Sequence, residues 1–320
     1  MAVQQWLADC FRHTAFSVAP ITGDASARSY YRVHCKQQSF IVLVDPKNET
    51  TPSFLTIRAL LYNIGLSVPQ LFVQNNEQGF LLLSDLGKQQ YDNALSNPHR
   101  AHTLYCQAFY PLIWMQQTLL PSNTRVTLKT FSPDFMHQQL IFFKTWYLMQ
   151  HLHYNASNEV FEVLAPLFDR LVQEIAKQPL VFSHMDYHCR NLMVLRQQAM
   201  PGILDFQDAM WAPYTLDLVS LLKDCYIDWP RQQVIQWVRA FYDMKKQSNP
   251  ETMMVDFQTF FKGFDWMGVQ RHLRILGTFA RLHHLYGKSS YLQYIPRILG
   301  YLLEMCELYP ELKPLQNYLH

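Results

Sequence analysis

Hydrophobic and polar positions in the first quarter of the chain alternate in short blocks separated by turns. Blocks rich in β-branched and aromatic side chains predict five strands, at residues 16–22, 29–35, 39–44, 71–74 and 80–87. After the third block, Pro52 and Ser53 open a stretch with apolar spacing of three and four that ends at Gly65, as is typical of a helix. The pattern predicts a small sheet with one helix over residues 10–86.

After Gly87 the hydrophobic period changes to that of helices. The pattern predicts helices at residues 99–119, 134–153, 158–177, 214–226, 230–246, 253–262, 265–286 and 291–307. A β-like patch at residues 180–206 interrupts them. We therefore expect an α+β protein with two lobes. Residues 1–86 would form a small antiparallel β-rich lobe, a short connection would lie at residues 84–87, and residues 87–320 would form a large, mainly helical lobe.

Composition limits the possible partners. Lys and Arg number 27, Asp and Glu number 25, and the formal net charge is +2, so we expect a small-molecule partner and no nucleic acid. No apolar run approaches the roughly 18 residues of a membrane helix, and the N-terminus lacks the pattern of a secretory signal. The six cysteines form no CxxC pair and are expected to be reduced thiols. We expect a cytoplasmic protein that has no membrane partner and acts as a monomer.

The strongest candidate for chemistry is the stretch SHMDYHCRNLMVL, residues 183–195. Its alternating His184, Asp186 and His188 would share one face of a strand and could hold zinc in a hydrolase. A phosphoryl-transfer loop would instead use Asp186 to orient a substrate hydroxyl and Asn191, five residues on, to hold Mg²⁺. A polar loop without chemistry is the third interpretation.

The residues that follow favour phosphoryl transfer. A short apolar strand begins at Asn191, a polar turn follows, and a second strand ends in Asp205. This hairpin is expected to bring the side chains of Asp186, Asn191 and Asp205 together at one end. Each of the three would have a separate role in phosphoryl transfer. Zinc would need a third or fourth soft ligand, whereas His283 and His284 lie far along the chain on an amphipathic helix.

The motifs HMDYHCRN, residues 184–191, and ILDFQDA, residues 203–209, resemble the catalytic and metal motifs of the aminoglycoside phosphotransferase and choline kinase superfamily. The similarity covers nearly the whole chain, including ITGDASARSYYRV at residues 21–33, and it implies a two-lobed protein-kinase-like fold. Together, residues 23–33, 80–87, 205–230 and 264–292 carry a narrower resemblance, to the anomeric N-acetylmuramate and N-acetylglucosamine kinases of cell-wall recycling.

The resemblance implies roles at the matching positions. Asp186 would be the catalytic carboxylate that orients the sugar hydroxyl, and Asn191 and Asp205 would bind Mg²⁺. His184 and Asp217 would support the catalytic loop. Residues 1–86 would be the nucleotide-binding lobe and residues 87–320 the catalytic and substrate-binding lobe, with a hinge at residues 84–87. ATP would be bound by a loop over its phosphates and by the backbone of the hinge, at Gly23, Asp24, Ser26, Arg28, Ser84 and Leu86.

The third strand departs from the family pattern. Kinases of this fold usually place a lysine there to hold the α- and β-phosphates, but here Leu43 or Val44 occupies that place. The helix that follows also lacks the glutamate that pairs with this lysine. Another cation, namely Arg28, Arg32 or Lys47, could supply the charge, or the chain could be a nucleotide-binding pseudokinase.

The acceptor is expected to lie against the large lobe. Arg271, His272 and Arg274 make the distinctive helix cationic, which suits a neutral or anionic acceptor unless these side chains face solvent. Asp208 could contact sugar hydroxyls. We thus predict an ATP-dependent kinase that phosphorylates the anomeric hydroxyl of N-acetylmuramate or N-acetylglucosamine. The alternatives are an aminoglycoside- or choline-type kinase and a pseudokinase.

Overall fold

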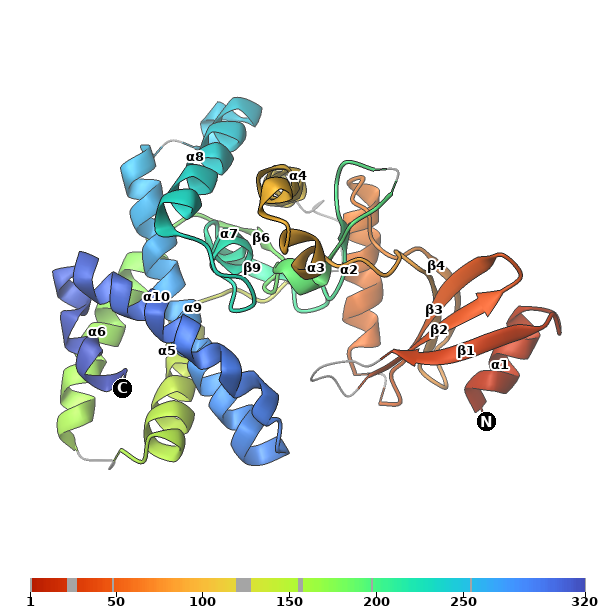
Figure 1. Ribbon diagram of the computed structural model, residues 1–320, viewed down its shortest axis with the longest axis horizontal. Helices are drawn as coiled ribbons and strands as arrows, with labels where there is room; N and C mark the ends of the chain where they lie inside the picture. The colour runs from red at the N-terminus through yellow and green to blue at the C-terminus, as the bar shows by residue number, and fades with distance from the viewer. Residues whose placement is uncertain are drawn as a thin grey trace. The chain divides into compact units, whose positions relative to one another are not determined.

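The computed structural model describes residues 2–21, 28–47, 49–118, 128–154, 158–196, 198–253 and 255–319. The chain packs into two compact units, which are Met1–Tyr91 with Arg190–Asp208, and Asp92–Cys189 with Ala209–His320. The first unit holds an antiparallel sheet and the second is mainly helical (Figure 1). The predicted α+β class is therefore confirmed.

The sheet of the N-terminal unit contains the predicted strands, all antiparallel, in the order β1-β2-β3-β5-β4. Their bounds are β1(Phe16–Ile21), β2(Ser29–Cys35), β3(Gln38–Val44), β4(Leu71–Asn75) and β5(Phe80–Ser84). Alternate residues of a strand share one face of the sheet. On one face Val33, Val42 and Leu82 form a buried cluster that supplies the core of this unit.

The N-terminal unit contains two α-helices in addition to the strands of the sheet, whereas one was predicted. α2(Thr51–Asn63) is the predicted helix. The additional helix is α1(Ala2–Cys10), which places Leu7 in the buried cluster and Trp6 against Phe80, with ring centroids 5.5 Å apart. A helix this short is marginal by itself and is stabilised mainly by its packing on the sheet, so its sequence carries little local signal.

The hairpin after the catalytic motif belongs to the first unit. Its strands are β7(Leu192–Met193) and β8(Gly202–Ile203). The backbone N–H of Ile203 donates to the carbonyl oxygen of Ser67 at 2.8 Å, which ties the hairpin to the N-terminal chain. Packing therefore divides the chain differently from the expected boundary at residue 86, because residues 190–208 join the N-terminal unit. The assignment of nucleotide binding and catalysis to separate lobes stays a prediction.

The second unit is built from helices and one pair of strands. Its main helices are α4(Pro98–Gln117), α5(Pro133–Phe142), α6(Asn158–Ala176), α7(Leu216–Leu222), α8(Arg231–Ser248), α9(Phe257–Tyr286) and α10(Ile295–Leu308). The π-helix η1(Phe143–His151) continues α5, and β6(Leu180–Ser183) pairs antiparallel with β9(Met210–Pro213). The short α3(Tyr91–Leu95) precedes α4. None of the helices that the structure describes is long and apolar enough to cross a bilayer.

One prediction about the second unit was wrong, because residues 253–262 and 265–286 contribute to a single helix, α9. Asp256 caps its N-terminus by accepting a backbone N–H of the first turn at 2.8 Å. Gly263, where the apolar pattern breaks, lies inside the helix, and its carbonyl oxygen accepts a 3.0 Å bond from Gln178 Nε2. A Cβ at Gly263 would crowd Gln178, so this glycine permits close packing instead of ending the helix.

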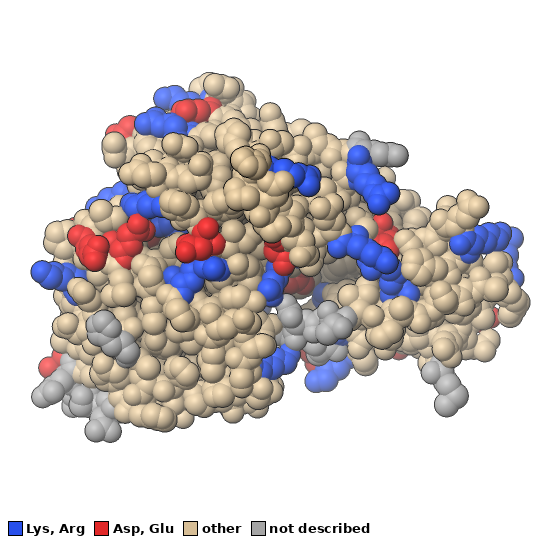
Figure 2. Space-filling view, viewed as in Figure 1, with Lys and Arg blue, Asp and Glu red and all other residues tan. Residues whose placement is uncertain are grey.

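Charged side chains of both signs are interspersed over a mostly uncharged surface on the face that Figure 2 shows. No continuous basic stripe runs across this face. This distribution agrees with the small formal net charge of +2.

α9 approaches the junction between α5 and η1 most closely at Gly277. A Cβ atom there would lie directly on the backbone of Phe142 and Phe143. Gly277→Ala should therefore lower the free energy of unfolding by about 2–3 kcal/mol, as overpacking does, in urea denaturation. Gly300→Ala in α10 is the control, since no other atom lies within 4 Å of its added Cβ, and it should stabilise by about 0.5–1 kcal/mol. Equal effects of the two substitutions would contradict this packing.

Candidate active site

A buried carboxylate at the start of α7 holds the predicted catalytic loop. Asp217 accepts the backbone N–H of His184 at 2.6 Å and that of Met185 at 2.9 Å. His184 is fully buried, and its Nδ1 accepts the N–H of Asp186 at 3.3 Å. Burial raises the pKa of Asp217. These contacts hold the backbone of residues 184–186, and the supporting roles of His184 and Asp217 stay predictions.

Two residues of the motifs adopt a left-handed backbone. Met185, next to Asp186, has a φ of 79°, and Asp205 has a φ of 61°. Such a conformation costs a non-glycine residue on the order of 1 kcal/mol or more, and it persists where surrounding contacts impose it. For Met185 the bond from its N–H to Asp217 is such a contact. A left-handed backbone therefore occurs at Asp205 and directly before Asp186, two residues that the sequence assigned to chemistry.

Asp186 lies between cationic groups of the second unit. His188 Nε2 is 3.1 Å from Asp186 Oδ2, and Arg271 Nη2, on α9, is 3.4 Å from Asp186 Oδ1. Desolvation by itself would raise the pKa of Asp186, but His188, Arg271 and Arg274 hold that pKa well below its usual range. Burial would lower the pKa of His188, but Asp186 raises it. Asp186 is therefore ionised at neutral pH and can orient a hydroxyl.

We expected Arg271 and His272 to contact the acceptor. Their side chains lie in different environments. Arg271 is 5% exposed and faces Asp186, so its charge acts first on the carboxylate of this protein. His272 is 1% exposed, and its Nε2 lies 2.9 Å from the carbonyl oxygen of Lys223. Its ring stacks on Tyr301 with centroids 4.9 Å apart, and burial lowers the pKa of His272 to about 3. These contacts favour a packing role for His272.

The sequence reasoning did not single out the segment between α7 and α8. Asp224 Oδ1 accepts the N–H groups of Tyr226 and Ile227, both at 2.9 Å, and so fixes the turn of this segment. The ring of Tyr226 packs edge-on against His188, with centroids 5.2 Å apart. The segment therefore contacts the histidine that pairs with Asp186. The signal was present in the sequence, because DCYIDWP is part of the narrower family resemblance.

Asn191 and Asp205 lie at the same end of the β7–β8 hairpin. The N–H of Leu204 donates to the carbonyl oxygen of Asn191 at 2.9 Å, so Asn191 lies opposite the residue before Asp205. Gln207 Nε2 donates to Asp205 Oδ1 at 2.9 Å. Mg²⁺ prefers oxygen ligands and is usually held by one or two protein groups together with substrate phosphates. An amide and a carboxylate at one hairpin end fit such a site.

The zinc interpretation gains no support from the side chains. Among the residues that the structure describes, no three His, Cys, Asp or Glu side chains converge on a position where they could hold a metal ion. His283 and His284 lie at the C-terminal end of α9, with ring centroids 4.7 Å apart.

Arg28 lies close to the same hairpin in the N-terminal unit. Its Nε donates to Thr50 Oγ1 at 2.7 Å, and its guanidinium lies 5.7 Å from the ring centre of Phe54. Phe54 stacks on Phe206, the residue after Asp205, with centroids 5.0 Å apart. Arg28 is therefore a cation near the hairpin that carries Asn191 and Asp205.

The other two candidates for the missing lysine charge have different positions. Arg32 Nε lies 2.7 Å from Asp85 Oδ2, and Arg32 Nη2 donates to the carbonyl oxygen of Gly87 at 2.7 Å, so Arg32 is already engaged. Lys47 is exposed in a turn, and Leu43 on β3 is fully buried. Arg28 is accordingly the best placed of the three cations.

Hydrogen bonds and an ion pair connect the expected hinge, residues 84–87, to the rest of the N-terminal unit. Ser84 N donates to Gln70 O and Gln70 N donates to Ser84 Oγ, both at 2.8 Å. Asp85 pairs with Arg32 and also accepts the N–H of Gly87 at 2.9 Å. Ser84 and Leu86, which we expected to bind adenine, therefore belong to a segment that hydrogen-bonds within the N-terminal unit.

The structure gives less information on the remaining predicted site residues. Gly23, Asp24 and Ser26 lie outside the described residues. Asp208 is exposed, and Gln207 Nε2 lies 3.5 Å from its Oδ2.

Comparisons of the sequence with known proteins identify relatives of this chain. The N-acetylmuramate/N-acetylglucosamine kinase of Pseudomonas aeruginosa is 35% identical over 297 residues, which cover 92% of this chain and 86% of that protein. The protein of the same name from Neisseria meningitidis is 31% identical over 323 residues, covering 98% and 92%. The narrower resemblance seen in the sequence is thus confirmed.

The fold has solved relatives as well. The crystal structure of choline kinase from Cryptosporidium parvum matches with a TM-score of 0.67 at 12% identity and covers 99% of each chain, so the kinase-like fold is confirmed. Residues 17–253, most of the chain, match the phosphotransferase enzyme family. This chain therefore belongs to the phosphotransferase enzyme family.

Proposed function

We propose that this protein is an ATP-dependent sugar kinase that phosphorylates the anomeric hydroxyl of N-acetylmuramate, N-acetylglucosamine or both. The observation that carries the proposal is Asp186, held ionised by His188 and Arg271 inside a phosphotransferase motif. The names of the similar kinases from Pseudomonas aeruginosa and Neisseria meningitidis supply the substrate class.

The reaction needs little covalent chemistry from the protein. The sugar oxygen attacks the γ-phosphorus, the bond from that phosphorus to the β–γ bridging oxygen breaks, and ADP leaves with the electron pair. Asp186 orients the sugar hydroxyl and accepts its proton. Positioning and charge neutralisation supply most of the catalysis in such transfers. His188 and Arg271 keep Asp186 ionised and in place for this task.

The N-terminal unit supplies the groups that would hold the nucleotide and its metal. Asn191 and Asp205 would bind Mg²⁺, which neutralises phosphate charge when bound. Arg28 would replace the missing lysine beside the phosphates, with Gly23, Asp24 and Ser26 in the covering loop. The backbone of Ser84 and Leu86 would bond adenine.

The charges around Asp186 bear on the choice of acceptor. Arg271 and Arg274 both contribute positive potential at this carboxylate. A cationic acceptor such as choline or an aminoglycoside would be repelled by these arginines, whereas a neutral or anionic sugar would not. Asp208 remains the proposed contact for sugar hydroxyls. The pseudokinase alternative is disfavoured because the carboxylate needed for turnover is present and ionised.

A panel of acceptors tests the proposed function directly. With Mg²⁺ and ATP, the purified protein should phosphorylate N-acetylmuramate or N-acetylglucosamine and leave choline and kanamycin unmodified. In ³¹P and ¹H NMR spectra of the product, the phosphorus should couple to the anomeric proton. Phosphate at another carbon would refute the anomeric assignment, and nucleotide binding without turnover of any acceptor would favour a pseudokinase.

Asp186→Asn should lower kcat by at least about 1,000-fold, because the amide cannot accept the hydroxyl proton. Nucleotide affinity should change little, as measured by calorimetric titration with ATP and Mg²⁺. Asp169→Asn, at an exposed position of α6, is the matched control and should retain activity. Undiminished turnover in Asp186→Asn would remove Asp186 from the mechanism.

Arg271→Met should shift the pH dependence of the reaction. Arg271 helps to lower the pKa of Asp186, so its removal should raise that pKa toward the usual value. Because the ionised carboxylate is the active form, the acid limb of the kcat/KM profile should move to higher pH. Arg281→Met is the control on the same helix, since Arg281 lies over the ring of Phe142 and should leave the limb in place. Identical profiles for the wild-type protein and Arg271→Met would contradict this account.

A further inference from the structure

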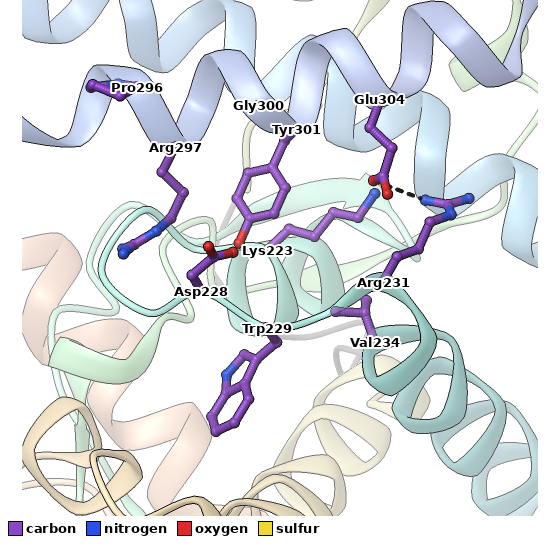
Figure 3. Close-up of a pocket in the computed structure, with 10 residues that line it drawn as sticks. All are labelled: Lys223, Asp228, Trp229, Arg231, Val234, Pro296, Arg297, Gly300, Tyr301 and Glu304. Carbon is purple, nitrogen blue, oxygen red and sulfur yellow. Dashed lines mark hydrogen bonds and ion pairs between the residues drawn. The ribbon is translucent and has the colours of Figure 1, made fainter.

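A pocket of about 290 Å³ lies within the helical unit (Figure 3). Side chains of α10, of the first turns of α8 and of the segment before α8 line it, including Asp228, Trp229, Arg231, Arg297, Tyr301 and Glu304. Its volume is near the lower end of the range for small-molecule sites, which suits a ligand or substituent of monosaccharide size or smaller. Aromatic and charged groups together are suited to binding a polar ring with an ionised substituent.

Two of the three cations of this pocket already have carboxylate partners. Lys223 Nζ lies 2.9 Å from Asp265 Oδ1, and both side chains are buried. Arg231 Nη2 lies 2.8 Å from Asp265 Oδ2, and its Nη1 lies 3.3 Å from Glu304 Oε2. These four groups form a network of two positive and two negative charges, so the network leaves little attraction for an added anion.

Arg297 differs from the other two cations. Its Nη1 donates to the carbonyl oxygen of Cys225 at 2.7 Å, and no carboxylate of the described ranges forms an ion pair with it. Asp228, the remaining acidic residue of the pocket, likewise has no ion-pair partner within those ranges. Figure 3 shows Arg297 and Asp228 at one end of the pocket and the Arg231–Glu304 pair at the other. One end thus presents a guanidinium that has no carboxylate ion-pair partner within those ranges, beside the carboxylate of Asp228.

The same end of the pocket is connected to Asp186 through the segment before α8. Arg297 holds the carbonyl oxygen of Cys225, and the next residue, Tyr226, packs on His188. His188 in turn lies 3.1 Å from Asp186. Within the helical unit, one short stretch of chain therefore separates Arg297 from the surroundings of the catalytic carboxylate.

We propose that this pocket is the subsite for the carboxylate-bearing side arm of an acidic amino sugar and that Arg297 pairs with that carboxylate. The inference rests on the proposed function and specifies its substrate class. N-acetylmuramate differs from N-acetylglucosamine by a lactyl ether whose carboxylate lies away from the anomeric hydroxyl. This carboxylate would be repelled by Asp186, and Arg271 is already paired with Asp186. Arg297 is the pocket cation that can form a bidentate pair with it.

The test compares the two sugars in wild-type protein and Arg297→Gln. For N-acetylmuramate, kcat/KM should fall at least about tenfold, mainly through KM, because a charge-assisted pair made in the ground state is lost. For N-acetylglucosamine it should change less than about twofold. Arg297→Lys should recover part of the N-acetylmuramate activity. Arg239→Gln, whose guanidinium lies over the ring of Phe257, is the control and should affect neither sugar. An equal loss for both sugars, or no loss, would overturn the proposal.

A binding measurement separates this inference from the proposed function. Calorimetric titrations with N-acetylmuramate, N-acetylglucosamine and free lactate can be made on the wild-type protein whether or not either sugar is phosphorylated. Tighter binding of N-acetylmuramate than of N-acetylglucosamine, lost in Arg297→Gln, would support the subsite even if turnover failed. Equal affinities for the two sugars, an unchanged preference in the variant, or no binding of either sugar would overturn it.

Discussion

The candidate active site depends on the two cationic groups that the fold places beside the half-exposed carboxylate of Asp186. His188 contributes from within the loop, and Arg271 contributes from α9. The position of α9 is fixed by close packing against η1 at Gly277. The cationic surroundings of this carboxylate thus depend on the packing of the longest helix in the unit.

The functional motif is continuous in sequence but is divided between two packing units. Asp186 belongs to the helical unit and is held there by contacts around Asp217. Asn191, five residues on, begins the hairpin that packs with the N-terminal unit and brings Asp205 near Arg28. A short covalent connection therefore links the group proposed to act on the acceptor with the groups proposed to act on the nucleotide.

The arginines of this protein have different partners. Arg32 fixes the hinge segment, Arg271 serves Asp186, and Arg231 completes a buried ion network. Arg297, in contrast, has no ion-pair partner among the carboxylates that the structure describes, and Arg28 lies beside Thr50 and Phe54. They are the two positions at which we place ligand anions, the phosphates of a nucleotide and the carboxylate of a sugar acid.

The sequence by itself determined the strands, most helices and the ordered motif from His184 to Asp205, because periodicity, turn residues and motif spacing act over a few residues. It did not reveal α1, the continuity of α9 or the N-terminal packing of the β7–β8 hairpin, all of which depend on distant contacts. The roles of the cations were decided only by the tertiary structure. Arg271 lies 85 residues from Asp186 along the chain, and no local pattern distinguishes it from Arg297. Only the folded structure determines which arginine pairs with a carboxylate of the protein and which one we propose to pair with a carboxylate of a ligand.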